Sequence, residues 1–323
     1  MGSYVIYFPY FRGKQYELIT IRESAAILSE SDFVPIVEPV KSQLSALSKT
    51  IDATLEEGAD IIVIVNPRIG DFSGSNDELV RLINEKYGED KQVTVGVLLD
   101  ESTTLEQATE IINSFEGQKI ALVHSGFSQA KALAVEIENN AQIAFSVFED
   151  GKSGKLYQKH FKHQKHRVLL KDGFEKRRNA DHPDVEEVFS DLHLTYGLEG
   201  MTGFADFLMV GDDYQESGGP AYTIAIHLTY INAADDDIMY IRHFKSDRQD
   251  TPTDPAGKFA EALTKLISHL DSPDNQYYET SAIVEFRALH KKGHYPGLGY
   301  VKKLAMKHHI ETFAKYFKDN SVQ

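Results

Sequence analysis

Seven short apolar runs alternate with amphipathic stretches along the first half of the chain, and this alternation constrains the fold more than any other feature. The runs are rich in Val and Ile and mostly continuous, as in "ADIIVIVNP" and "QVTVGVLLD", which is typical of strands buried on both faces. They predict strands at residues 4–10, 33–40, 59–67, 92–100, 118–126, 141–150 and 166–174. Strands that alternate with helices at a spacing of roughly thirty residues favour a (β/α)8 TIM-barrel-like fold. An open doubly wound sheet is the alternative.

The pattern changes after Phe174, where a polar segment with at most one helix begins. The run "FADFLMVGD" is expected to form the eighth barrel strand, and "AYTIAIHLTYI" and "DIMYIRHF" predict a β-hairpin around an acidic turn. Helices are expected at residues 254–271, 279–291 and 298–318. Because no Pro/Ser-rich linker is visible, we expect one domain over residues 1–323. Its additions would be an insertion and hairpin region at 175–250 and C-terminal helices at 254–323.

Composition excludes several classes of site. The chain has no cysteine, so it can form neither disulfides nor a thiolate metal site. No apolar run is long enough to span a membrane, and the N-terminus lacks the pattern of a secretory signal, so we expect a cytoplasmic protein. No glycine-rich phosphate fingerprint follows a strand, which weakens a dinucleotide-binding version of the fold. The sequence predicts no metal site and leaves the cofactor unknown.

The charge is strongly acidic but unevenly distributed. A net charge of −15 makes general binding to nucleic acid unlikely, because affinity for phosphate backbones comes from clustered Lys and Arg. Residues 152–178 nevertheless hold ten Lys or Arg against two acidic residues, a net +8, which leaves −23 for the rest. Part of this basic window is expected to be the solvated face of a helix.

Charged and polar residues follow the predicted strands, where a barrel has its active site. Glu38 and Asp100 are the candidate catalytic carboxylates at the ends of the second and fourth strands. Glu38 lies inside an apolar run and needs a partner, so an ion pair with Lys14 or Lys41 is the structural alternative. The candidate ligand-binding residues at the strand ends are Arg12, Lys14, Lys41, Asn66, Arg68, His124 and Lys171. We expect Lys14, Glu38, Arg68 and Asp100 to converge at the mouth.

The loop after the seventh strand, "KDGFEKRRNADH", is dense in basic residues. Barrel phosphate sites often use the loops after the seventh and eighth strands, and a guanidinium group offers a fork of donors to phosphate. Arg177 and Arg178 are therefore candidate anion ligands, and an exposed basic loop is the alternative.

Histidine occurs in three notable places. In "AYTIAIHLTY" the alternation puts His227 on a small, polar strand face. We expect it to form a hydrogen bond with Asp206 or Asp212, which would raise its pKa and support general acid–base chemistry, with Asp206 as second catalytic group. A histidine packed against its Thr neighbours is the alternative. The spacing in "HFKHQKH" is a weak metal signal, and the histidines of "KHHIE" are expected on the surface.

Several segments resemble a known family. "FPYFRGKQYELITIRES" followed by "FVPIVEPVK" resembles the opening of the beta-protein family of phage and bacterial open reading frames. "RNADHP", "GFADFLMVGDDYQESGGPAYTIAIHLTY", "RHFKSD" and "PGLGYVKKLAMKHHIE" are similar to a bacterial branch of that family. The resemblance implies a barrel-like fold and an association with phage or mobile-element genes, with antiphage defence as a possible context. It implies no reaction and no catalytic residues.

Two functions follow as expectations. The first is a protein that binds or acts on a small anionic ligand, phosphorylated or nucleotide-like, in a charged cleft at the strand ends. The second is a non-catalytic sensor or scaffold that binds a partner effector protein from a neighbouring gene. The sequence leaves open whether the protein is an enzyme.

Overall fold

The computed structural model describes residues 6–72, 76–216, 219 and 221–320. Contacts between residues divide the chain into two compact units. The first joins Met1–Asp172 to Leu192–Asp206, and the second joins Gly173–Asp191 to Phe207–Gln323. The chain therefore leaves the first unit after residue 172, returns to it at residue 192 and leaves it again after residue 206.

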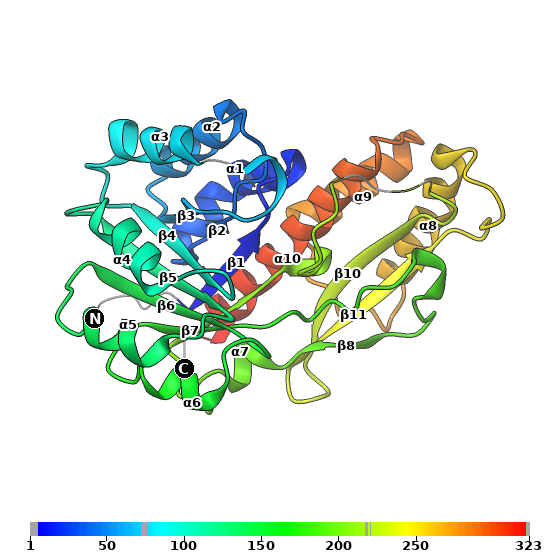
Figure 1. The fold of residues 1–323 in the computed structure, drawn as a ribbon. Helices are drawn as coiled ribbons and strands as arrows, with labels where there is room; N and C mark the ends of the chain where they lie inside the picture. The colour runs from blue at the N-terminus through cyan, green and yellow to red at the C-terminus, as the bar shows by residue number, and fades with distance from the viewer. Residues whose placement is uncertain (1–5, 73–75, 217–218, 220, 321–323) are drawn as a thin grey trace. The chain divides into compact units, whose positions relative to one another are not determined.

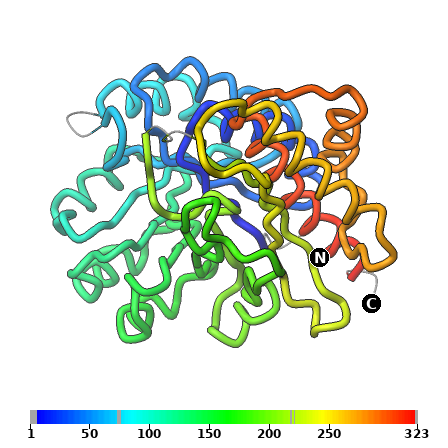
Figure 2. The backbone as a smooth tube through the Cα atoms, turned by 90° about the vertical axis from the view of Figure 1, so that its right-hand side faces the viewer, coloured from blue at the N-terminus to red at the C-terminus, as the bar shows by residue number. Residues whose placement is uncertain are grey.

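The first unit is a closed barrel of eight parallel strands, which confirms the predicted (β/α)8 fold. Its last strand, β9, pairs with both β7 and β1 and closes the barrel as expected from "FADFLMVGD". In Figure 2 the chain runs around this unit from blue through cyan to green. The strands are Tyr7–Phe11 (β1), Ile36–Val37 (β2), Ile61–Ile64 (β3), Val93–Asp100 (β4), Lys119–Ser125 (β5), Ile143–Glu149 (β6), Arg167–Leu170 (β7) and Gly203–Asp206 (β9).

The direction of each barrel side chain follows from one ring contact and the strand register. The rings of Phe8 on β1 and Phe145 on β6 have centroids 5.3 Å apart, although these strands are not neighbours. Phe8 and Phe145 therefore meet inside the barrel. Because side chains alternate along a strand, Tyr10 also points inward. The parallel register sets Tyr10 level with Ile36, and Ile36 level with Ile62, so the inward positions can be followed from strand to strand.

Helices connect the consecutive barrel strands and are labelled in Figure 1. The fourth, α4, begins at a capping box in which Thr104 and Gln107 exchange hydrogen bonds between side chain and backbone. The sixth, α6, is short and ends at Lys159. The helices are Gln15–Glu30 (α1), Ser45–Glu56 (α2), Asp77–Tyr87 (α3), Leu105–Asn113 (α4), Ala130–Glu136 (α5), Lys155–Lys159 (α6) and Leu192–Thr195 (α7), with a 3-10 turn at Gly70–Phe72 (η1).

The second unit contains an antiparallel sheet in the order β10-β11-β8 and three long helices. The predicted hairpin is formed by Ala225–Asn232 (β10) and Ile238–Lys245 (β11). Its third strand, Glu187–Ser190 (β8), lies in the segment where we expected at most one helix. The remaining elements are the helices Pro255–Leu270 (α8), Ser281–Lys292 (α9) and Leu298–Asn320 (α10), close to the predicted ranges, and the 3-10 turns Asn179–Asp181 (η2) and Leu208–Val210 (η3).

Helices cover both faces of the hairpin. On one face Phe244 contacts His269 of α8, and on the other Thr229 forms a hydrogen bond of 2.8 Å with His309 of α10. Apart from residues 192–206, which belong to the first unit, the insertion and the C-terminal helices, expected as two additions to a single domain, form one compact unit. Among the described residues, no helix combines the length and apolar character that a membrane crossing requires.

The histidines of α10 are buried, so the prediction that they lie on the surface is wrong. His308 and His309 are both 0% exposed, because α10 packs this face against β10. His308 Nε2 lies 2.9 Å from the Thr229 carbonyl oxygen, and its Nδ1 lies 2.7 Å from the Thr280 hydroxyl. A neutral imidazole satisfies both contacts, because Nε2–H donates and Nδ1 accepts. Burial lowers the pKa of His308 to about 4.

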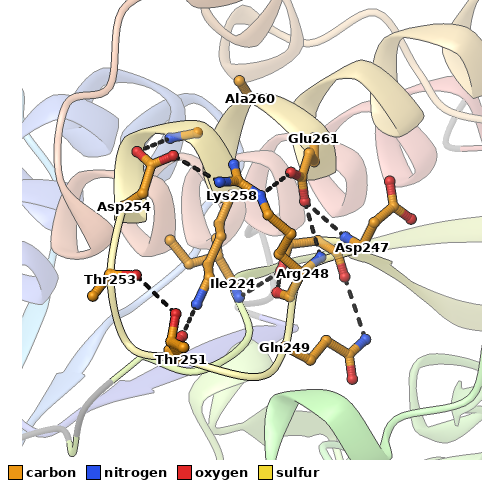
Figure 3. Close-up of polar contacts among 12 residues, drawn as sticks. Ile224, Asp247, Arg248, Gln249, Thr251, Thr253, Asp254, Lys258, Ala260 and Glu261 are labelled. Carbon is orange, nitrogen blue, oxygen red and sulfur yellow. Dashed lines mark hydrogen bonds and ion pairs between the residues drawn. The ribbon is translucent and has the colours of Figure 1, made fainter.

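A buried lysine fixes the start of α8. Lys258 is 1% exposed, and its ammonium group donates to the carbonyl oxygens of Ala221, Tyr222 and Thr251, at 3.3 Å and 2.6 Å for the first two. Figure 3 shows the side chain reaching from the helix into the loop that carries Thr251. Three carbonyl dipoles thus replace the water that the charge loses on burial.

Replacing this lysine should destabilise the second unit. Lys258→Met keeps the length of the side chain but removes the donor to three carbonyl oxygens, and we expect a loss of about 2 kcal/mol in the free energy of unfolding, measured by urea denaturation. Lys265→Met is the matched control on the same helix. Lys265 pairs with Asp247 near the surface, so this change should cost less than about 0.5 kcal/mol. Equal losses in the two variants would contradict the role given to Lys258.

Candidate functional site

Two neighbouring strands place a buried carboxylate inside the barrel at its C-terminal end. The register that sets Tyr10 level with Ile36 makes Glu38, two residues on, an inward residue as well. Glu38 is 1% exposed, accepts a hydrogen bond of 2.8 Å from the Tyr10 hydroxyl and forms an ion pair with Arg12. Burial, followed by the charge of Glu38, raises the pKa of Tyr10 well above its usual value, so the phenol stays a donor. The partner of Glu38 is thus Arg12, whereas the sequence had indicated Lys14 or Lys41.

The next two strands add a second ion pair at the same end. Arg68 Nε lies 3.2 Å from Asp100 Oδ2, and Asp100 Oδ1 accepts hydrogen bonds from the hydroxyl groups of Ser102 and Thr103 at 2.8 Å and 2.7 Å. Partial burial alone would raise the pKa of Asp100. The hydrogen bonds from Thr103 and Ser102, together with the charge of Arg68, outweigh burial and lower the pKa. Asp100 is therefore an anchored carboxylate, while Arg68 keeps 43% of its side chain exposed.

A third carboxylate comes from β6. The register sets Phe148 level with His124, whose ring lies outside the barrel, so the following residue, Glu149, points inward. Its charge contributes to the raised pKa of Tyr10. Glu149 is 8% exposed and pairs with Lys152 at 2.7 Å. Each of these three carboxylates, Glu38, Asp100 and Glu149, thus has its own cation, Arg12, Arg68 or Lys152.

Two loops at the mouth, those after β2 and β3, approach each other closely. Gly70 has a left-handed φ of +69°, and a Cβ atom there would lie 2.1 Å from the carbonyl oxygen of Val40. Only glycine allows this contact between the loops after β2 and β3. Beside it, Lys41 pairs with Asp71 at 3.6 Å, and both side chains are exposed. Lys41 therefore lies at the rim of the mouth.

A side chain from the first turn of α1 accepts a hydrogen bond at the start of the same helix. Lys14 is the N-cap residue, and Glu17 accepts a hydrogen bond of 2.6 Å from the backbone N–H of Arg12. Burial raises the pKa of Glu17, although the charge of Lys14 opposes this shift. The carboxylate of Glu17 therefore compensates the partial positive charge of this helix N-terminus. Lys14 is half-buried next to it.

Three of the predicted ligand-binding residues do not present their side chains to the mouth. Asn66 is buried and bonds to the backbone of Leu98, with its amide donating to the carbonyl oxygen and its oxygen accepting from the N–H, both at 2.8 Å. It extends the pairing of β3 and β4. Lys171 follows the inward Leu170 and therefore points away from the barrel interior.

His124 is the third, and its assignment to the mouth is wrong. Its ring stacks on Phe148 with an interplanar angle of 8° and contacts Phe161, and its Nδ1 lies 2.6 Å from the hydroxyl of Tyr157 on α6. It thus lies between the barrel wall and α6, one residue away from the inward Ser125. Burial lowers the pKa of His124 to about 3, and within the described part of the chain its Nε2 has no hydrogen-bond partner.

The expected pair of His227 with a carboxylate is also wrong. His227 Nδ1 lies 2.7 Å from His243 Nδ1, and burial, followed by the charges of His243 and His182, lowers the pKa of His227 well below its usual value. Asp206 instead accepts a hydrogen bond of 2.9 Å from the Tyr7 hydroxyl. Tyr7 alternates with the inward Phe8, so Asp206 lies on the outer side of the barrel wall and is not a mouth residue.

The two candidate arginines belong to the second unit, where carboxylates hold both. Arg177 Nη1 bonds to both oxygens of Glu187, at 2.6 Å and 2.9 Å, and Arg178 pairs with Asp181 at 2.6 Å. Arg178 keeps 85% of its side chain exposed, as the alternative of a basic surface loop requires. Their approach to the mouth stays a prediction.

Sequence reasoning missed several residues of these arrangements. Tyr10 was hidden in an apolar run, although its alternation with Phe8 marks it as inward. His243 could have been found from the hairpin, since pairing around Asp235 sets His227 level with it. No local pattern marked His182, which joins them from another segment.

Comparisons with known proteins give little further information. No family model and no curated protein matches the chain. Among solved structures, FabK from Thermotoga maritima aligns with 95% of this chain and 94% of its own, at 13% sequence identity and a TM-score of 0.37. A similarity at this level carries no argument about function.

Proposed function

We propose that the barrel mouth binds a small anionic ligand of the phosphorylated or nucleotide-like class. The observation that carries this proposal is the alternation of charge at the C-terminal end of the barrel, where Arg12, Glu38, Arg68 and Asp100 follow one another at the ends of four neighbouring strands, β1 to β4. Active sites of (β/α)8 enzymes lie at this end. The ligand would contact cations at the rim and acceptors deeper in the barrel.

Exposure divides the mouth into a rim and a floor. Arg68 and Lys152 keep 43% and 45% of their side chains exposed, whereas Arg12 and Glu38 keep 15% and 2%. An anionic group can reach the exposed cations and bind Arg68 through two parallel hydrogen bonds. In this proposal a donor group of the same ligand, such as a hydroxyl or a base N–H, would bind the carboxylate of Glu38.

Charge pairs of this kind are poor evidence for stability. Desolvation of two charges offsets most of their attraction, and apolar residues of the same volume often stabilise a core equally well. Three ion pairs at one end of the barrel are therefore better explained by binding. If the protein is an enzyme, Glu38 and Asp100 are the groups we propose for proton transfer, because both are carboxylates with fixed positions.

Removing the exposed rim cation should weaken binding. We expect at least one compound from a panel of nucleotides, sugar phosphates and inorganic phosphate to raise the melting temperature of the wild type, because it binds the folded state. In Arg68→Gln the affinity for that compound should fall about 10- to 100-fold, the effect of losing charge-assisted hydrogen bonds. Thermal shift titrations with each compound and its unphosphorylated counterpart measure this.

Lys86→Gln is the matched control, because Lys86 pairs with Asp52 on the outer helices and is 45% exposed, as Arg68 is 43%. Its affinity should equal that of the wild type. The proposal fails if no phosphorylated compound shifts the melting temperature, or if Arg68→Gln and Lys86→Gln respond alike.

A second function, binding to a partner protein, is favoured by two exposed leucines on neighbouring segments of the first unit. Leu156 of α6 and Leu198 after α7 are 75% and 87% exposed, and an ion pair between Lys155 and Glu199 joins the two segments. Exposed leucines of this kind are typical of interaction surfaces. The partner we propose is the product of a neighbouring gene. Co-purification of that product with the wild type, and its loss in Leu156→Ser/Leu198→Ser, would support this function.

The biological context we propose is conflict between phages, mobile elements and their hosts. It rests on the segments that resemble the beta-protein family and on no other observation. Protection of cells against a panel of phages, compared between cells with and without the gene, tests it. Unchanged plaque numbers across the panel would count against this context.

A further inference from the structure

Three histidines of the second unit converge on one point. His227 on β10 and His243 on β11 are level in the hairpin and lie on the same face, and His182 reaches them from the segment that follows η2. The ring centroids are 4.2 Å apart for His182 and His243, 4.8 Å for His182 and His227, and 4.9 Å for His227 and His243. One nitrogen atom from each ring lies within 4.8 Å of the other two.

The ring of His182 is buried without a hydrogen bond. The residue is 2% exposed, and among the described residues neither of its ring nitrogens has a hydrogen-bond partner. Buried polar atoms are normally paired, and an exception calls for an explanation. A ligand that accepts the lone pair of this ring would supply one.

A carboxylate orients the second histidine. His243 Nε2 lies 2.9 Å from Glu187 Oε1, and Arg177 holds both oxygens of Glu187. A carboxylate acceptor places the ring proton on Nε2 and leaves the lone pair on Nδ1, which faces His227. Metal-binding histidines commonly have such a carboxylate partner on the other nitrogen.

Surrounding residues fix the position of His182. Lys245 is 8% exposed, donates a hydrogen bond of 2.5 Å to the carbonyl oxygen of His182 and pairs with Asp184 at 2.9 Å. The ring of Phe174 contacts both His182 and His227, with centroids 5.5 Å and 5.2 Å away. Lys245 thus fixes the backbone of His182, and the ring of Phe174 limits the access of water to the histidines.

We propose that His182, His227 and His243 bind a zinc ion, with Glu187 as the carboxylate that orients His243. Zinc binds imidazole nitrogens at about 2.0–2.1 Å, and a tetrahedral arrangement sets those nitrogens about 3.3 Å apart. The observed nitrogens lie between 2.7 Å and 4.8 Å from one another, so small ring rotations reach the required spacing. Three protein ligands leave a fourth position for water, as in catalytic zinc sites. The site lies within the second unit and is independent of the ligand proposed for the barrel mouth.

Zinc binding can be measured directly on the full chain. Protein treated with a chelator and then exchanged into chelator-free buffer should bind one equivalent of Zn²⁺ in calorimetry, and added Zn²⁺ should raise its melting temperature. Co²⁺ in place of Zn²⁺ should give the intense visible absorption of a tetrahedral site. Glu187→Gln, which removes the charge but keeps the acceptor, should weaken binding about 10- to 100-fold.

Two variants make the result decisive. His182→Leu replaces a buried, unbonded ring by an apolar side chain, so the metal-free protein should fold and melt at the same or a higher temperature while stoichiometric zinc binding is lost. His160→Gln/His163→Gln removes two exposed histidines of "HFKHQKH" and should bind zinc like the wild type. The proposal is overturned if the wild type binds no zinc, if His182→Leu binds it unchanged, or if the surface variant loses it.

Discussion

Between about pH 7.5 and pH 5, one buried histidine in each unit should remove about 2 kcal/mol from the free energy of unfolding of that unit. His124 in the first unit and His308 in the second are both 0% exposed, and burial lowers their pKa values to about 3 and about 4. An unfolded histidine takes up a proton near pH 6.5. Between that pH and the lower folded pKa the unfolded state binds more protons, so stability falls as the pH falls.

The size of the effect depends little on the folded pKa values. At pH 5 both rings are still neutral in the folded protein and almost fully charged in the unfolded chain, which gives about 2 kcal/mol for each. Glu17 acts in the opposite direction, because its raised pKa lets the folded state take up a proton first. Carboxylates with lowered pKa values, such as Asp100, contribute only at more acidic pH.

A double variant isolates the contribution of His124. In His124→Phe/Tyr157→Phe the two partners of one hydrogen bond are replaced by rings that fit between Phe148 and Phe161. Urea denaturation between pH 7.5 and pH 5 should show a loss smaller than that of the wild type by about 2 kcal/mol. His163→Gln, at an exposed position, serves as the control and should lose as much as the wild type. An unchanged pH dependence in the double variant would contradict the assignment.

The sequence allowed the barrel to be predicted because its strands are buried on both faces and therefore nearly continuous in apolar residues. It did not allow β8 to be predicted. "EVFS" is short and lies in a polar segment, and it becomes a strand because it pairs with the edge of β11. The second unit as a whole could not be predicted for the same reason, because it too depends on long-range contacts. Its core depends on contacts between the hairpin and helices that follow it by tens of residues.

The candidate site was predicted by position along the strands but not by direction. Arg12, Glu38, Arg68 and Asp100 were found because a strand end is visible as the end of an apolar run. His124 and Ser125 show the limit, since adjacent residues point to opposite faces and only the register with β4 and β6 decides which one is inward. His182 shows a second limit, because its contact with the hairpin is long-range and no periodicity encodes it.

Removing the carboxylate at the floor of the mouth should destabilise the barrel strongly. In Glu38→Ala the guanidinium of Arg12 loses its buried counter-charge and the Tyr10 hydroxyl loses its acceptor, and we expect a loss of about 3–5 kcal/mol in the free energy of unfolding. Urea denaturation at neutral pH measures it. Glu23→Ala, an exposed carboxylate on α1, is the control and should change stability by less than about 0.5 kcal/mol.

A triple variant separates stability from binding at this position. Tyr10→Phe/Arg12→Met/Glu38→Leu removes the whole polar group, so neither an uncompensated charge nor an unpaired hydroxyl of the three remains. Its free energy of unfolding should therefore lie within about 1 kcal/mol of the wild-type value or above it. The ligand-dependent rise in melting temperature should nevertheless disappear, because the acceptor at the floor and its supporting cation are gone. A triple variant that is as unstable as Glu38→Ala would mean that these charges serve the fold, and the mouth would lose its main support as a binding site. A triple variant that is stable and still responds to the ligand would place binding at Arg68 and Lys152 alone.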